Sequence, residues 1–274
     1  MQLMLIYVEH LMPAKTQDGT PSSSRRLFFV YAPPLKGARP SKRKPPKPPY
    51  KGAPPWKNSV YYYWWEYLRR HRGYAKTCER GGKGAYAKLY RDFGDVHAGT
   101  FWQWWKQHQE LFCEPPPPYA RIVALSDVRE LPSDSLLIQV SLEQRLALTL
   151  RQIKRQLSGM VAINKRHKTP SKARYPVHTK PVLSTLHRCL AVWDTKEAQP
   201  DWPNFLIKGY VDGAVSEADI LEFLSSTDEE RKQRIAGDTQ QRIENTYAVS
   251  RDYRIAQQYI DNVALGFFPK RSTR

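Results

Sequence analysis

Near the end of the sequence lie four side chains of the types that hydrogen-bond base edges and phosphates: Asn245, Ser250, Arg251 and Arg254. An arginine can pair with two acceptors of guanine at once, and an asparagine can do the same with adenine. A solvated helix face presents the same residue types, so the pattern alone leaves both interpretations open. The local change from acidic character before residue 244 to basic character after it supports the nucleic-acid interpretation.

The chain as a whole carries a large excess of positive charge. Its 274 residues include 44 lysines and arginines against 26 acids, which gives a formal net charge of +18. Such an excess attracts polyanions, because each neutralised phosphate releases condensed counterions. A merely soluble basic surface is the alternative. The composition therefore predicts a nucleic acid as the partner.

The first acid-free stretch lies between Asp18 and Glu66 and holds a proline-rich run, 33–55. Proline fixes φ and removes a backbone donor, so the run cannot form a helix or an inner strand. We expect an extended basic arm there, or a linker of the same composition. The candidate phosphate contacts of this arm are Lys42, Arg43, Lys44 and Lys47.

A second acid-free stretch runs from Gln144 to Trp193. A helix is expected over 142–157, with leucines and an isoleucine on one face and basic residues on the other. Its candidate phosphate contacts are Arg151, Lys154 and Arg155, and a loop or tether that follows adds Lys165 and Arg166. Arg69, Arg70 and Arg72 are expected to close an earlier helix, where they complement its dipole or clamp phosphates.

Residues for metal or nucleophilic chemistry are not grouped in this sequence. No two cysteines or histidines have a zinc-like spacing, and Asp194 with Lys196 lacks the further carboxylates of a metal nuclease. We therefore expect no catalytic residue, no metal and no cofactor, and a nuclease is the least favoured alternative. The three scattered cysteines and the lack of a membrane-length apolar segment predict a soluble cytoplasmic protein without a membrane partner.

These side chains need helices to position them, and helical spacing dominates the sequence. Caps at Ser59 and Thr100 and a stop at Gly94 predict three helices in an aromatic-rich unit. Trp64, Trp104 and Trp105 are expected in its core. Four more rings cannot all face inward, so some are expected to be exposed to a base or another protein: Tyr61, Tyr62, Trp65 and Trp102.

The predicted fold class is mainly α. A minor β-hairpin is expected from the apolar runs 122–125 and 136–140, and several short helices before a long final one resemble a helix-turn-helix domain. Five consecutive segments are expected: an N-terminal segment with the basic arm (1–57), the aromatic-rich helical unit (58–118), the hairpin with the amphipathic helix (119–163), a basic linker (164–181) and the helix-turn-helix-like domain (182–274).

The strings YYYWWEYLRRH, LYRDFGDVH and FWQWW resemble uncharacterised proteins of bacterial mobile elements and prophage-like islands. The end, VSRDYRIAQQYIDNVALGFFP, is similar to the terminal helix of helix-turn-helix proteins from the same setting. The resemblance implies DNA binding in a bacterial cytoplasm and names no catalytic motif.

The sequence therefore predicts a protein that holds duplex DNA through its arm and its final helix, as a regulator or accessory factor. Two alternatives stay open. One is a module that binds single-stranded DNA or RNA by stacking bases on aromatic rings. The other is an assembly factor whose exposed aromatic rings within 58–112 dock another protein.

Overall fold

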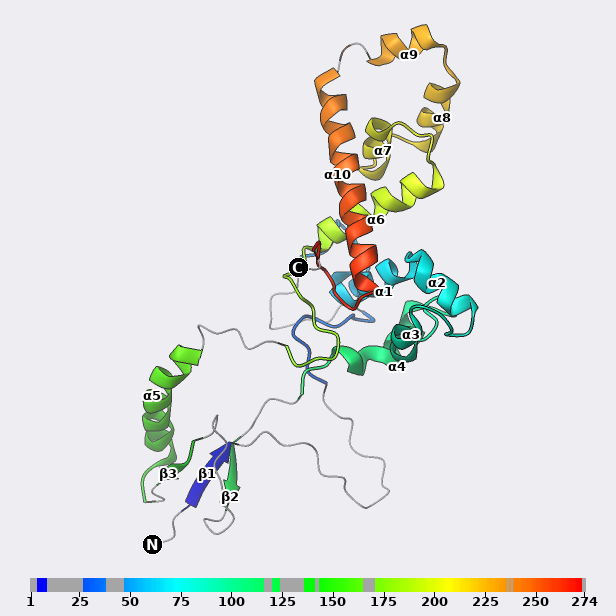
Figure 1. Ribbon diagram of the computed structural model, residues 1–274. Helices are drawn as coiled ribbons and strands as arrows, with labels where there is room; N and C mark the ends of the chain where they lie inside the picture. The colour runs from blue at the N-terminus through cyan, green and yellow to red at the C-terminus, as the bar shows by residue number, and fades with distance from the viewer. Residues whose placement is uncertain are drawn as a thin grey trace. The chain divides into compact units, whose positions relative to one another are not determined.

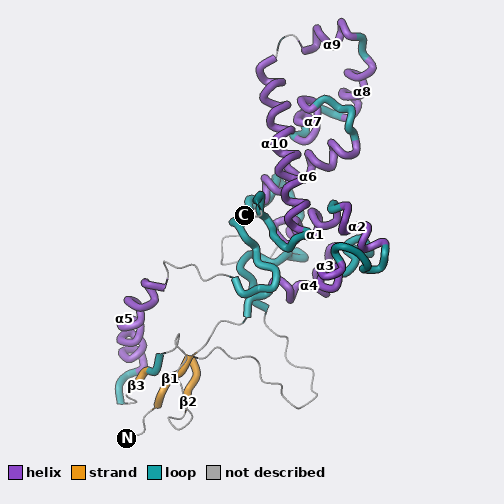
Figure 2. Tube along the Cα trace, in the orientation of Figure 1, coloured by secondary structure: helices purple, strands orange, loops and turns teal. Residues whose placement is uncertain are grey.

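The computed structural model describes residues 4–8, 27–37, 47–115, 120–123, 136–140, 143–164, 171–235, 237 and 239–272. The fold is mainly helical, as the sequence predicts (Figures 1 and 2). Its residues form two compact units, each made of two separate parts of the sequence. We call Met1–Phe28 with Glu114–Lys172 the small unit, and Phe29–Cys113 with Ala173–Arg274 the large unit. The five segments of the sequence are thus distributed over two units.

The large unit contains two groups of helices. The first group is α1 (Val60–Arg69), α2 (Arg72–Glu79), α3 (Ala87–Phe93) and α4 (Phe101–His108), with 3-10 turns at Pro55–Asn58 and Gln109–Phe112. The second group is α6 (Leu183–Ala198), α7 (Asn204–Val211), α8 (Glu217–Ser225), α9 (Asp228–Ile235) and α10 (Thr239–Val263). Figure 1 shows α6 crossing α10, and the two helices are in contact.

Local capping explains where these helices begin and end. The Ser59 hydroxyl accepts a hydrogen bond from the Tyr61 N–H, and Thr100 forms a reciprocal capping box with Gln103. Gly94 ends α3 with φ of 61°, a backbone conformation that a residue with Cβ rarely adopts. The expected caps and stops of the aromatic-rich helices are therefore confirmed.

One core joins the aromatic-rich helices to the C-terminal helices. Tyr63 and Trp64 of α1 are fully buried in a cluster that also holds Leu186 of α6 and Phe268 after α10. The centroids of the Trp64 and Phe268 rings lie 5.5 Å apart. A large aromatic ring buries about 150 to 250 Å². Burying these rings therefore brings together segments that are distant in the sequence.

A second, smaller core lies among α6, α7, α8 and α10. Its buried members are Val192, Trp202, Ile207, Ile220 and Val249. Because α10 contributes Val249 here and further apolar residues to the aromatic core, this single helix is held by both.

The three arginines expected at the end of the first helix are divided between two helices. Arg70 caps the end of α1, and Arg72 begins α2, a helix that the sequence analysis did not predict. His71 lies between them, and its Nδ1 accepts a hydrogen bond from the Tyr74 N–H at 2.9 Å. Because the link contains neither glycine nor proline, it gives no local signal of a break.

The small unit contains β1 (Met4–Val8), β2 (Ala120–Val123), β3 (Ile138–Val140) and α5 (Leu146–Asn164). The predicted hairpin is wrong. Both expected strands form, yet neither pairs with the other, because β1 lies between them in the order β2-β1-β3. Ile6 is opposite Ile122 on one side and Ile138 on the other, and both pairings are antiparallel.

The described parts of the proline-rich run, 33–37 and 47–55, and residues 173–181 of the expected linker belong to the large unit. Pro34 and Pro49 are buried, and the Tyr175 N–H donates to the Leu111 carbonyl at 3.0 Å. The His178 N–H likewise donates to the Phe268 carbonyl at 3.1 Å. These parts are therefore neither a free arm nor a free tether.

We expect the large unit to lose stability in mild acid. Burial lowers the pKa of four histidines, His71, His97, His178 and His187. The unfolded chain takes up these protons near the usual pKa of about 6.5, whereas the folded chain resists them until a lower pH. This contribution to stability is therefore complete above the unfolded-state pKa of about 6.5. It is lost as the pH falls from there through the lower pKa of the folded state.

Urea denaturation at pH 7.5, 6.5 and 5.5 tests this expectation, and the midpoint should fall with pH. His71→Asn provides the control, because asparagine still caps a helix but does not titrate. The variant should lose less stability on acidification than the wild type. A midpoint that stays constant or rises toward pH 5.5 contradicts the prediction.

Candidate nucleic-acid interface

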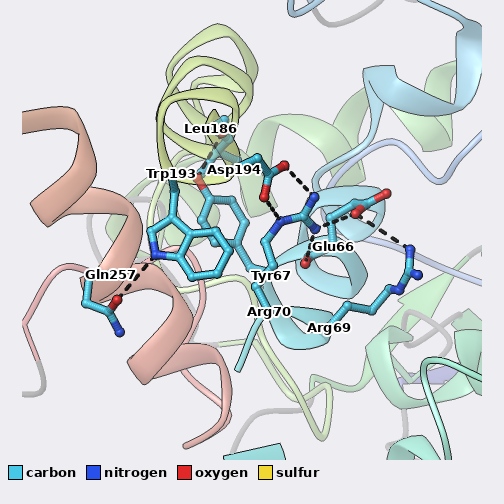
Figure 3. Close-up of polar contacts among 8 residues, drawn as sticks. All are labelled: Glu66, Tyr67, Arg69, Arg70, Leu186, Trp193, Asp194 and Gln257. Atoms are coloured by element: carbon cyan, nitrogen blue, oxygen red, sulfur yellow. Dashed lines mark hydrogen bonds and ion pairs between the residues drawn. The ribbon is translucent and has the colours of Figure 1, made fainter. Parts of the chain in front are cut away.

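Arg70 is engaged in an internal ion-pair network (Figure 3). Its Nε and Nη2 donate to the two Asp194 oxygens at 2.5 and 2.6 Å, and its Nη1 donates to Glu66 Oε2 at 2.5 Å. Burial lowers the pKa of the guanidinium, but the hydrogen bonds to Asp194 and Glu66 outweigh this effect and raise the pKa overall. Since both of its carboxylate partners belong to the protein, Arg70 is not a free phosphate clamp.

The contacts around Arg70 connect α1, α6 and α10. The Tyr67 hydroxyl donates to the Leu186 carbonyl at 2.8 Å, and Trp193 Nε1 donates to Gln257 Oε1 at 3.3 Å (Figure 3). Each of these hydrogen bonds joins two different helices. The network is therefore a structural junction.

Arg69 and Arg72 also have partners within the protein. The Arg69 guanidinium lies over the Trp65 ring, 4.5 Å from its centroid, and its Nη1 is 4.0 Å from Glu66 Oε2. Arg72 is exposed, and its Nη2 is 2.5 Å from Glu197 Oε2. Arg69 and Arg70 thus share Glu66, and Arg72 is paired with Glu197, so each of the three arginines expected to clamp phosphates has a partner within the protein.

Four residues of α10 lie close together on one face. Tyr247 lies three and four residues before Ser250 and Arg251, and Arg254 lies four and three residues after them. With Glu244 and Ala248 they line a hollow of about 500 Å³. Arg251 Nε is 3.5 Å from Asp252 Oδ1, whereas Arg254 is exposed and no described carboxylate lies within ion-pair distance of it. This face gathers three of the four predicted contacts of the final helix.

Asn245 lies elsewhere on α10. It precedes Tyr247 by two residues, which is about 200° of rotation around the helix axis. Its Oδ1 accepts a hydrogen bond from Gln241 Nε2 at 3.1 Å, and its side chain is half-buried. Asn245 therefore does not share a surface with Arg251 and Arg254.

The basic residues of α5 are exposed on the small unit. Within the described ranges, Arg151, Lys154 and Arg155 have no carboxylate within ion-pair distance. The apolar face of α5 is open at its start, since Leu146 is 71% exposed and Leu150 56%. Lys42, Arg43, Lys44, Lys165 and Arg166 lie outside the described residues.

Lys47 is exposed and lines a separate hollow of about 460 Å³, whose other basic residue is Lys180. Sequence reasoning did not select Lys180 as a contact. Lys180 belongs to the second acid-free stretch, so the sequence does mark it as a cation in a basic region. Nothing in that stretch shows that residue 180 lies near residue 47.

The rings expected on the surface of the aromatic-rich unit are not exposed. Tyr61 is 1% exposed and Trp65 5%, and both belong to the core. Tyr62 and Trp102 are half-buried and pack against it. Within 58–112, every aromatic side chain is buried or half-buried, so the expected exposed rings for docking a protein are absent from this segment.

The residues considered for nuclease chemistry have structural partners. Asp194 holds Arg70, and Lys196 Nζ donates to the Pro200 carbonyl at 3.2 Å. No group of three or more histidine, cysteine or acidic residues in the described part of the chain could hold a metal ion.

The chain matches no protein-family model, no curated protein sequence and no solved structure. Within the described ranges, no helix combines the length and apolar composition that a membrane span requires.

We expect Arg70→Ala to lower the free energy of unfolding by about 2 kcal/mol. A fully buried pair would lose roughly 3 to 5 kcal/mol, but water screens this one because the Asp194 side chain is 42% exposed. Arg72→Ala is the matched control. Its side chain is 79% exposed, so the loss should be no more than about 0.5 kcal/mol. Equal losses in urea denaturation would contradict the assigned role of Arg70.

Proposed function

We propose that the protein binds duplex DNA by contacting its phosphates, and that the exposed arginines of α10 are central to this contact. The observation that carries the proposal is the α10 face, where Arg251 and Arg254 line one hollow on a well-packed helix. The resemblance of the sequence to mobile-element proteins supports a role as regulator or accessory factor of such an element.

The spacing of the two arginines suits a phosphate backbone. Arg251 and Arg254 are separated by three residues, which is about 4.5 Å along a helix axis. Phosphates of one DNA strand follow one another at about 3.4 Å along the duplex axis. Two flexible arginines at this spacing can therefore reach neighbouring phosphates, or one phosphate and a base edge.

Free and paired cations should contribute differently to binding. A cation without a carboxylate partner neutralises a phosphate directly and releases its counterions. A paired arginine must first give up its own carboxylate, so its net contribution is smaller. Arg254 has no such partner among the described residues, and Arg251 has only a longer contact, with its Nε 3.5 Å from Asp252 Oδ1. The matched control therefore removes equal charge from arginines that carboxylates hold more closely.

Replacing Arg251 and Arg254 together with glutamine should weaken binding to a duplex of about 25 base pairs. The slope of log K against log salt should become shallower by about 1.8, because each lost phosphate contact removes about 0.9. Fluorescence anisotropy titrations between about 50 and 200 mM salt measure this slope.

The matched control replaces Arg72 and Arg174 with glutamine. Both are exposed, but their Nη2 atoms lie 2.5 Å from oxygens of Glu197 and Asp92. This control removes the same charge and should change the slope less. Equal slopes in the two double variants would show that net charge alone drives binding and would contradict the role of the α10 face.

One observation favours the single-strand alternative. Tyr247 is 71% exposed beside Arg251, so its ring is free to stack on an unpaired base. If the protein holds duplex DNA, Tyr247→Leu should change its affinity less than about fivefold, and duplex should compete better than single strands. Preference for single strands, with a larger loss in Tyr247→Leu, would support the alternative.

A further inference from the structure

We infer that the large unit has a second phosphate-binding place at the start of α6, formed by Lys47, Lys180, Lys270 and Arg271. We call it the α6 hollow. This inference deepens the proposed function and rests on it, because the phosphates concerned are those of a nucleic-acid backbone. Three of its four cations were not among the contacts predicted from the sequence.

The α6 hollow consists of two adjoining depressions. The first, of about 460 Å³, lies among segments 31–32, 47–48, 58–60 and 180–184. The second, of about 330 Å³, lies between the first turn of α6 and Pro269–Arg271, with Tyr259 beside it. Because Lys180 and Val182 line both, the two depressions meet at the start of the helix.

The residues that line the α6 hollow include four cations and no acid. Lys47 and Lys180 line the first depression, and Lys180, Lys270 and Arg271 line the second. None of the residues that line either depression is acidic. The hollow beside Arg70, in contrast, includes both Glu197 and Asp261. An anion in the α6 hollow would therefore meet attraction from both sides.

These cations are available to an external anion. Lys47 and Lys180 are exposed, and no carboxylate of the described residues lies within ion-pair distance of them. Arg271 Nε donates to the Tyr259 hydroxyl at 3.4 Å, and Lys270 Nζ lies 5.2 Å from the centroid of the Phe267 ring. These two neutral partners orient the side chains but leave their charge uncompensated.

The start of α6 adds neutral donors to the same place. The first N–H groups of a helix have no partner within it, and the N-cap residue Val182 supplies no side-chain cap. Ser184 and Thr185 offer hydroxyl groups, one lining each depression. The hollow is thus suited to a polar occupant.

A repeating polyanion fits this arrangement better than a single small anion. Two depressions that share Lys180 can receive two neighbouring phosphates, with this lysine between them. The basic residues Lys42, Arg43 and Lys44 precede Lys47 closely in the sequence, and so add charge to the same part of the chain. A small anion would occupy one depression and leave the other cations unused.

The test is the double variant Lys180→Gln with Arg271→Gln, titrated with duplex DNA of unrelated sequences. The slope of log K against log salt should become shallower by about 1.8, and all sequences should lose affinity by a similar factor. The matched control replaces Lys76 and Lys88, two exposed lysines of α2 and α3 that line neither depression. The control should change the slope less.

The outcomes separate the two proposals. Suppose that the wild type binds duplex with a steep salt dependence, but that the variant at Lys180 and Arg271 has the same slope as the control at Lys76 and Lys88. The phosphate-binding role of the α6 hollow is then overturned and the proposed function stands. If the wild type shows no salt-dependent binding, both fail. Should the double variant be unstable in urea denaturation, Lys180→Gln alone keeps the test, because Lys180 is exposed. Its slope should then change by about 0.9.

Discussion

The large unit depends on the burial of the α1 aromatic side chains against α6 and the segment after α10. Tyr63, Trp64 and Tyr67 have no exposed surface, so the first helix is stable only when the C-terminal part of the chain covers it. Arg70 at the end of α1 adds a polar contact to α6, because its carboxylate partner Asp194 belongs to that helix and lies 124 residues away in the sequence. Arg70 is half-buried, so an arrangement of the two helices that separated it from Asp194 would lose this ion pair.

This packing determines which cations are free. The net charge of +18 is a property of the sequence, but a phosphate meets individual side chains. Arg70, Arg174 and Arg188 are each held by a carboxylate of the protein, whereas Arg254 and Lys180 have no such partner among the described residues. The distinction cannot be read from charge density, because Lys180 lies between Arg174 and Arg188 in the same acid-free stretch.

The sequence predicts the helices well where their signals are local. Ser59, Thr100 and Gly94 act through residues within a few positions, so their effect is visible in the sequence. The failures concern distant partners. β2 and β3 were expected to pair with each other because β1, more than 100 residues away, gave no alternating pattern that identified it. The partners of Arg70 and the approach of Lys180 to Lys47 are long-range in the same sense.

In the candidate site, too, the sequence predicts what depends on nearby residues and misses what depends on distant ones. Helical periodicity alone places Ser250, Arg251 and Arg254 together, and it also separates Asn245 from them, although the residue types had grouped all four. Rigidity is the property that periodicity cannot supply. α10 gains it from two cores and from Asp252, which is 1% exposed and paired with Arg188 at 2.6 Å. The next residue, Asp252, is fixed by this ion pair, so the backbone that carries Arg251 is fixed as well. The Arg251 side chain therefore projects from a rigid position. A cation held in this way loses less conformational freedom on meeting a phosphate than one on a free chain.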